Sequence, residues 1–168
     1  YLKRVREIAR DNHWKLEFYG VRELKKKKAG AFLAVAQGSP TSDAGIVRLR
    51  YTPAGRRARK DKLILVGKGI CYDTGGTNLK PANSMFGMHE DMQGSAVALG
   101  TLLALTRLQV DFTVECWMAL AMNHIGPKAY KPNDVVTAAG GTTIEIVHTD
   151  AEGRMVLCDT LALASREN

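Results

Sequence analysis

The segment DFTVECWMALAMN, residues 111–123, constrains the fold more than any other part of the chain. Apolar side chains occupy consecutive positions along it, whereas a strand with one solvent-facing side alternates apolar and polar residues. A run of this kind is typical of a strand that is buried on both faces. We therefore predict that it forms a central strand in a sheet that other elements cover on each side.

The rest of the sequence predicts helices and strands in alternation, which indicates an α/β fold. Apolar spacing predicts helices at residues 1–10, 94–108 and 152–168, and a short helix at 21–30 that Gly30 stops. The expected architecture is a three-layer sandwich with a central mixed, mostly parallel sheet flanked by helices. Apolar or alternating runs bounded by turn residues predict further strands at 14–20, 31–39, 44–53, 61–69 and 142–150.

The length and composition indicate a soluble, cytoplasmic protein of one domain, large enough to bury a hydrophobic core. Of the 168 residues, 45% are hydrophobic and 24% are charged, as in an ordinary globular domain. No apolar run approaches the roughly 18 residues that a membrane span needs. Three widely spaced cysteines, Cys71, Cys116 and Cys158, argue against a disulfide framework and favour a reducing compartment.

The formal net charge of +7 raises nucleic acid as an alternative partner. The charge comes mainly from two runs, KKKK at residues 25–28 and GRRARKDK at residues 55–62. Neither run is interleaved with aromatic side chains that could stack on bases. We therefore expect both runs to be solvated turns, and nucleic-acid binding is the less favoured interpretation.

Several charged residues occupy turns or predicted strand ends, and ligands bind at the carboxyl ends of strands in open α/β sheets. Four carboxylates at this edge would repel one another unless cations neutralised them, and divalent metal ions suit carboxylate oxygens. Two metals about 3.5–4 Å apart could share bridging carboxylates and activate a water molecule. The charged residues are Lys68, Asp73, Lys80, Asp91, Asp150, Glu152 and Arg154.

Each of these motifs also has a simpler interpretation. Lys68 in GKG could be a solvated turn lysine, and Asp73 in DTGG could cap a turn of its own backbone. Asp150 and Glu152 could cap the helix that begins near them. A phosphate-binding P-loop is excluded, because no Ser or Thr follows Lys68 and the GxxxxGK spacing is absent. It is the combination of the motifs that favours a metal site.

Three motifs, VGKGICYDTGGTNLKP, MHEDMQGSA and HTDAEGR, resemble the leucine aminopeptidase (cytosol aminopeptidase) family of dinuclear metallopeptidases. Their order and spacing fit from Lys68 to Arg154, and the resemblance covers most of the chain after about Phe32. It implies a metal-dependent aminopeptidase that releases N-terminal amino acids such as leucine from peptides. The nucleophile would be a water bridging two divalent metal ions, Zn²⁺ and/or Mn²⁺.

The resemblance also implies a role for each metal ligand. Asp73 and Glu152 would bridge the two metals, Lys68 and Asp91 would complete one site, and Asp150 would complete the other. A lysine can ligate a metal only as a neutral amine. Two nearby dications and desolvation would both lower the pKa of Lys68, which makes that unusual ligand feasible.

Three other residues receive roles from the same resemblance. Lys80 would remain charged and stabilise the oxyanion of the scissile bond. Arg154 would hold a bicarbonate ion that acts as general base, because the guanidinium fork suits a planar oxyanion. Met88 would line the pocket for the first side chain of the peptide.

The sequence departs from the usual family pattern at four positions near the motifs. His148 stands in place of an asparagine, His89 and Gln93 replace a lysine and a glycine, and Asn78 changes the segment after DTGG. None of these changes removes a predicted ligand, so we expect them to affect substrate preference. His148 is also a candidate for an additional metal ligand.

The resemblance implies that residues 1–168 are the N-terminal part of the peptidase catalytic domain. The family's N-terminal domain and the remainder of the catalytic domain would then lie outside this sequence. Family members form homo-hexamers, which we expect of the full-length protein. An inactive fragment, or an accessory role in binding nucleic acid through the basic runs, is the alternative.

Overall fold

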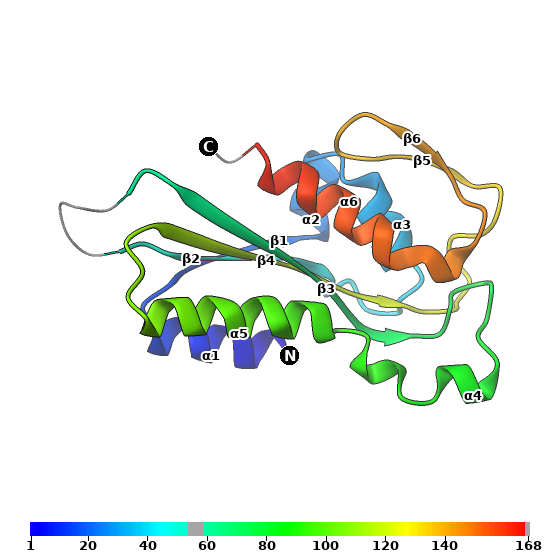
Figure 1. Cartoon of the computed structure of the whole chain (residues 1–168). Coiled ribbons are helices and arrows are strands. Elements are labelled where there is room, and N and C mark those ends of the chain that lie inside the picture. The colour runs from blue at the N-terminus through cyan, green and yellow to red at the C-terminus, as the bar shows by residue number, and fades with distance from the viewer. Residues whose placement is uncertain (54–58, 167–168) are drawn as a thin grey trace.

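The computed structural model of the chain describes residues 1–53 and 59–166 and has three layers (Figure 1). A four-stranded sheet forms the middle layer, and helices cover both of its faces. The predicted three-layer α/β sandwich is therefore confirmed. Over the described ranges, no helix is long and apolar enough to cross a membrane.

Strand β4 (Thr113–Asn123) lies inside the sheet, as its apolar sequence predicts. Its residues from Val114 to Ala121 are all buried, because helices cover both faces. The order of the strands is β1-β2-β4-β3. The other strands are β1 (Lys15–Gly20), β2 (Gly45–Tyr51) and β3 (Lys62–Asp73).

The sheet is mixed, and its antiparallel pairings outnumber its parallel one. Strands β3 and β4 are parallel, whereas β1–β2 and β2–β4 are antiparallel. Parallel neighbours need a connection that crosses back along the sheet, and helix α5 (Gln93–Arg107) provides it between β3 and β4. The chain leaves β1 and enters β2 at the same end, so Gly20 pairs with Gly45. The described part of the sheet is thus less parallel than expected.

Two separate hydrophobic cores hold the layers together. Helices α1 (Leu2–Asp11) and α5 cover one face of the sheet, where the core includes Val5, Leu49, Leu102, Met118 and Leu120. The opposite face carries α2 (Val21–Lys26), α3 (Gly30–Ala36) and α6 (Glu152–Ala164). The core on that face includes Phe32, Ile46, Ile70, Trp117, Val156 and Leu163.

Residues 31–39 do not form the predicted strand, because most of this segment belongs to helix α3. Nearly every side chain of α3 is buried, including Phe32 and Val35, so the helix lacks the polar face that normally reveals a helical period. Alanine, which makes up much of the segment, is the strongest helix former. The helix packs against α6 above the sheet.

The strand predicted at 142–150 is also shorter than expected. Only β6 (Thr143–Glu145) is extended and paired, and it forms a separate two-stranded hairpin with β5 (Val135–Thr137). The residues after it continue into a 3-10 helix, η2 (Thr149–Ala151), and then into α6. Asp150 and Glu152 therefore come from a helix start rather than from the end of a strand in the main sheet.

The carboxyl ends of β3 and β4 meet several shorter elements on the right of Figure 1. These are the β5–β6 hairpin, the start of α6, helix α4 (Ala82–Met85) and the 3-10 helix η1 (Met88–Glu90). The candidate site lies at this end of the molecule.

The basic run at 25–28 lies at the end of α2 and in the turn after it, and three of its four lysines are exposed. This confirms that the run is solvated. Of the second run, at 55–62, residues 55–58 lie outside the described ranges.

Candidate metal centre

A β-bulge in β3 sets the direction of the Asp73 side chain. Lys68 pairs with Ala119 and Ile70 with Ala121, but Asp73 pairs with Asn123, so three steps along β3 match two steps along β4. Side chains alternate between faces in a regular strand, and an interval of five would put Lys68 and Asp73 on opposite faces. The extra residue returns Asp73 to the face of Lys68.

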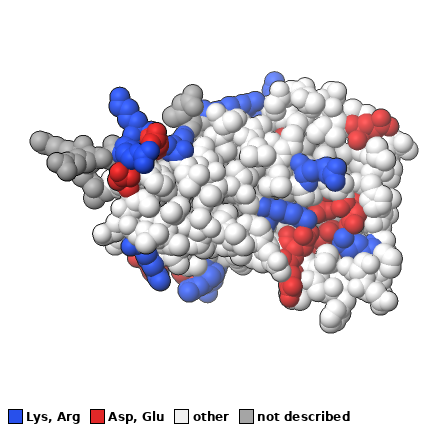
Figure 2. Space-filling model, viewed as in Figure 1, with Lys and Arg blue, Asp and Glu red and all other residues white. Residues whose placement is uncertain are grey.

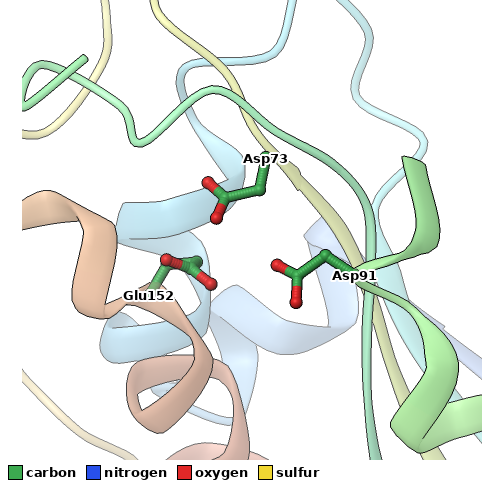
Figure 3. Close-up of side chains that lie close together, drawn as sticks. All are labelled: Asp73, Asp91 and Glu152. Carbon is green, nitrogen blue, oxygen red and sulfur yellow. The ribbon is translucent and has the colours of Figure 1, made fainter. Parts of the chain in front are cut away.

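Three carboxylates from separate elements converge at the end of this strand (Figure 3). Asp73 ends β3, Asp91 follows η1, and Glu152 begins α6. One oxygen of each lies within 4.8 Å of the others. The carboxylates point toward a common space, and Asp73 and Glu152 are buried. The structure therefore brings together three of the four carboxylates that the sequence singles out.

Two lysines lie among the carboxylates and link them in pairs. The Nζ atom of Lys68 is 2.7 Å from an oxygen of Asp91 and 2.6 Å from Oε1 of Glu152. The Nζ atom of Lys80 is 3.2 Å from Oδ2 of Asp73 and also pairs with Asp150. Asp150 thus joins the site through Lys80 and lies outside the group of three. In Figure 2, basic and acidic side chains touch at this end of the molecule.

Burial and the neighbouring charges shift the pKa values of the residues in the cluster. Burial raises the pKa of Asp91 and of Glu152 above their ordinary values, and the hydrogen bonds from Lys68 only partly oppose this. Burial on its own lowers the pKa of Lys68, but hydrogen bonds and attraction to Asp91 and Glu152 outweigh it and raise the pKa overall. The pKa of Lys80 is raised in the same way by Asp150 and Asp73, against the effect of burial.

The cluster has the donor chemistry of a divalent cation site. Its ligand atoms are carboxylate oxygens and amine nitrogens, which suit borderline divalent metals. The Oδ2 atom of Asp91 and the Oδ1 atom of Asp150 are buried and each faces a lysine ammonium group, but neither has a hydrogen bond of good geometry within the described residues. Buried carboxylate oxygens that face a cation without such a bond can accept a metal ion in its place, so the residues present fit a metal ion.

Two glycines are needed for the chain to reach this arrangement. A Cβ atom on Gly153 would lie 3.0 Å from Cδ and 3.1 Å from Nζ of Lys68, so a side chain at residue 153 would displace the end of Lys68 by a few tenths of an ångström. Gly75 has a φ of +88°, and its backbone N–H donates to Oδ1 of Asp73 at 2.8 Å. Asp73 therefore caps the DTGG turn, as the simpler interpretation held, and also faces Lys80 with its other oxygen.

Hydrogen bonds between Asn78 and Thr149 connect the loop after Asp73 to the 3-10 helix η2, which carries Asp150. The backbone N–H of Asn78 donates to Oγ1 of Thr149 at 2.8 Å, and the backbone N–H of Thr149 donates to Oδ1 of Asn78 at 2.8 Å. The Thr149 hydroxyl donates to the carbonyl of Gly75 at 2.6 Å. The sequence marks Asn78 only as a departure from the family pattern and does not single out Thr149 or Asn123, because their side chains are uncharged.

Arg154, Met88 and His148 lie in or beside the short elements that carry Asp91, Asp150 and Glu152. Arg154 is exposed near the start of α6 and lines a pocket of about 380 Å³ together with His148. Across the described chain, Arg154 is not an ion-pair partner of the four carboxylates. Met88 begins η1 and is half-buried.

His148 is exposed, and its Nδ1 atom accepts a hydrogen bond from the backbone N–H of Asp150 at 3.2 Å. In the part of the chain that the structure describes, the converging ligand atoms belong to the three carboxylates and not to His148. The structure therefore gives no support to His148 as an additional ligand. His89 and Gln93 are also exposed and both approach Glu90.

Curated relatives resemble this chain along most of its length. A probable cytosol aminopeptidase of Polaromonas sp. is 47% identical over 162 residues, which cover 96% of this chain and 31% of the relative. A probable cytosol aminopeptidase of Desulfovibrio desulfuricans is 45% identical and covers 98% of this chain and 32% of the relative. The chain thus spans about a third of the length of these relatives.

Solved structures share the fold. A leucyl aminopeptidase from Trypanosoma brucei in complex with actinonin matches with a TM-score of 0.89 and 37% identity, over 96% of this chain and 31% of that one. The apo leucyl aminopeptidase from Trypanosoma cruzi matches with a TM-score of 0.88 and 38% identity, over 95% and 31% of the two chains. The sequence model of the cytosol aminopeptidase family, catalytic domain, matches residues 1–168, and the chain belongs to this family.

Proposed function

We propose that the protein containing this chain is a metal-dependent aminopeptidase that releases N-terminal amino acids, such as leucine, from peptides. The observation that carries the proposal is the convergence of Asp73, Asp91 and Glu152 around Lys68, with oxygens within 4.8 Å of one another. The family match and the similarity to leucyl aminopeptidases support the same activity. When bound, two divalent ions such as Zn²⁺ or Mn²⁺ would polarise the scissile carbonyl and activate the attacking water.

Five side chains would hold the metals. Asp73 and Glu152 would serve both ions, because each already faces cationic groups with one oxygen and is fixed by the scaffold with the other. Lys68 and Asp91 would complete one site, and Asp150 would complete the other. Among protein groups alone the carboxylates raise the pKa of Lys68, so its role as a ligand requires the charge of a dication to displace its proton.

Lys80 and Arg154 would act on the substrate. The pKa of Lys80 is raised by Asp150 and Asp73, so it remains an ammonium group that can donate to a developing oxyanion. Arg154 is exposed and lines a pocket together with His148 and Ala151, and its guanidinium could hold a bicarbonate ion as general base. Met88, at the start of η1, would line the pocket for the first side chain of the peptide.

The remaining properties follow from the family and are part of the proposal. Residues 1–168 would be the N-terminal part of the catalytic domain, and the intact protein would be a cytoplasmic homo-hexamer. The isolated segment spans 31% of a relative and would lack much of the substrate pocket. The matches to aminopeptidases do not favour nucleic-acid binding as the main function.

The proposal is tested with the intact natural protein that contains this sequence. Hydrolysis of leucine amide and of Leu-Gly is measured after removal of metal and after addition of Zn²⁺ or Mn²⁺. We expect metal-dependent turnover that Asp73→Ala and Glu152→Ala abolish. Gly100→Ala, on the exposed side of α5, is the control and should retain activity. Absence of metal-dependent turnover in the wild type, or full activity in both carboxylate variants, would contradict the proposal.

A further inference from the structure

We propose that Asn123 is a positioning residue that selects which oxygen of Asp73 and which oxygen of Glu152 faces the metals. This inference rests on the proposed function, since it concerns the same site. Asn123 ends strand β4 and is fully buried, with 0% of its surface exposed. It belongs to no charged motif, yet it touches both carboxylates that would bridge the metals.

The side-chain amide of Asn123 donates toward three acceptors. Its Nδ2 atom lies 2.8 Å from Oδ1 of Asp73, 3.1 Å from the carbonyl oxygen of Thr149 and 3.4 Å from Oε2 of Glu152. An amide nitrogen carries two hydrogens, so the two shorter contacts are the primary bonds and the contact to Glu152 is the weaker one. One neutral group therefore connects β4, β3 and the start of α6.

These contacts divide the oxygens of each carboxylate into two kinds. On Asp73, Oδ1 accepts from Asn123 and from the backbone of Gly75, while Oδ2 faces the ammonium group of Lys80. On Glu152, Oε2 lies toward Asn123, while Oε1 faces Lys68. In both residues the scaffold holds the inner oxygen, and the outer oxygen is directed to a cation.

The chemistry of an amide suits this role. Asn123 is uncharged, so it fixes the carboxylates without competing with a metal for their charge, as an ammonium group does. A carboxylate at the same position would add another negative charge among four. An apolar side chain would leave Oδ1 of Asp73 with a single donor.

The position of Asn123 is itself fixed by the backbone. Its carbonyl oxygen accepts from both the N–H and the hydroxyl of Thr74, each at 2.9 Å. The register of the β3–β4 ladder places it beside Asp73, directly after the bulge. Groups that orient metal ligands in this way typically change metal affinity by about 10- to 100-fold when they are removed.

The test measures metal affinity separately from catalysis. Co²⁺ binding to the intact natural protein is measured by competition with a chromophoric chelator, and the visible spectrum of the Co²⁺ form reports ligand geometry. We compare wild type, Asn123→Ala and Asn123→Ser. Met118→Ala is the control for stability, because Met118 lies on the same strand but is buried in the opposite core.

We expect Asn123→Ala to weaken Co²⁺ binding by about 10- to 100-fold and to change the spectrum. Asn123→Ser retains a hydrogen-bond donor, so its loss of Co²⁺ affinity should be smaller. If Asn123→Ala does not fold, the Co²⁺ affinity and spectrum of Asn123→Ser decide the test. Met118→Ala should lower the unfolding temperature and leave affinity and spectrum unchanged. Wild-type affinity and spectrum in a folded Asn123 variant would overturn the inference. If the wild type binds Co²⁺ but no peptide is hydrolysed, the proposed function fails separately.

Discussion

Lys68 and Asp73 project from the same face of strand β3 although five positions separate them. The bulge between Ile70 and Asp73 adds one residue to β3, and this residue reverses the alternation of side chains. In a regular strand the interval of five would direct Asp73 to the sheet face that α1 and α5 cover, away from Asn123 and Glu152. The bulge therefore compensates for the odd interval between the two motifs GKG and DTGG.

Deletion of Cys71 should remove the bulge and leave Asp73 on the face of Lys68, because an interval of four in a regular strand returns to the same face and keeps Asp73 opposite Asn123. We expect the sheet to form, since the β3–β4 ladder before Ile70 is unaffected, and Co²⁺ binding to be retained. Cys71→Ala keeps the length of the strand and is the matched control, with binding close to that of wild type. Equilibrium dialysis and circular dichroism provide the measurements. Loss of Co²⁺ binding in the folded deletion variant, with binding retained in Cys71→Ala, would show that the alternation of side chains along β3 does not set the direction of Asp73.

Gly153→Ala should weaken metal binding without unfolding the protein. The added Cβ would lie 3.0–3.1 Å from three atoms of Lys68, so the lysine has to move by a few tenths of an ångström. Gly100→Ala is the matched control, because it also lies in a helix but meets nothing within 4 Å. It should stabilise α5 by about 0.5–1 kcal/mol. Chelator competition measures the metal affinity of the two variants, and thermal unfolding measures their stability. Equal metal affinity in Gly153→Ala and Gly100→Ala would contradict the steric argument.

Thr149→Val should destabilise the protein, whereas Thr149→Ser should not do so to the same extent. Valine has nearly the same shape but cannot donate to the carbonyl of Gly75 or accept from the N–H of Asn78, and both partners then lose a bond. Unsatisfied buried groups cost about 1–3 kcal/mol each, so we expect the two to lower the free energy of unfolding by roughly 2–6 kcal/mol. Urea unfolding measures it. Similar free energies of unfolding for the two variants would mean that the hydroxyl contributes little.

Glu115→Gln should lower the free energy of unfolding by about 3 kcal/mol near neutral pH, because it breaks a buried ion pair. Glu115 is fully buried and lies 2.7 Å from the Arg48 guanidinium, and the indole of Trp117 donates to it at 2.9 Å. Burial raises the pKa of Glu115, but these bonds outweigh it and hold the pKa below its ordinary value of 4.5.

The pH dependence of this variant follows from the sign of that shift. The native state binds the Glu115 proton less tightly than the unfolded state, so the pair stabilises the fold above about pH 4.5. This stabilisation is lost as the pH falls through the native pKa. The difference between wild type and Glu115→Gln should therefore be largest above pH 4.5 and shrink below it. A difference that stays constant from pH 7 to pH 3 would contradict this linkage.

The sequence predicted the elements whose apolar patterns are long and unambiguous. The central strand β4 and the helix α5 lie where the pattern places them, within a few residues. Helix α3 was predicted as a strand because all-round burial leaves no helical period to read in GAFLAVA. The direction of each strand depends on connections through space, which a local pattern does not contain.

The charged members of the site could be found from sequence because their spacing is unusual and specific. Lys68, Asp73, Asp91 and Glu152 do converge, and Asp150 joins them through Lys80. Asn123 could not be found in this way. An asparagine at the end of a strand is common, and its role follows only from the ladder that sets it opposite Asp73.

The pairing of four carboxylates with two lysines has a consequence for how the protein matures. Every carboxylate of the cluster already faces an ammonium group of the same chain. The two lysines offset half of the negative charge, so the fold can assemble with every carboxylate in an ion pair, unlike small zinc domains that fold only around their ion. Metal uptake is then an exchange of one cation for another. The affinity measured for a metal is the difference between the free energy of the metal–ligand bonds and that of the ion pairs they replace.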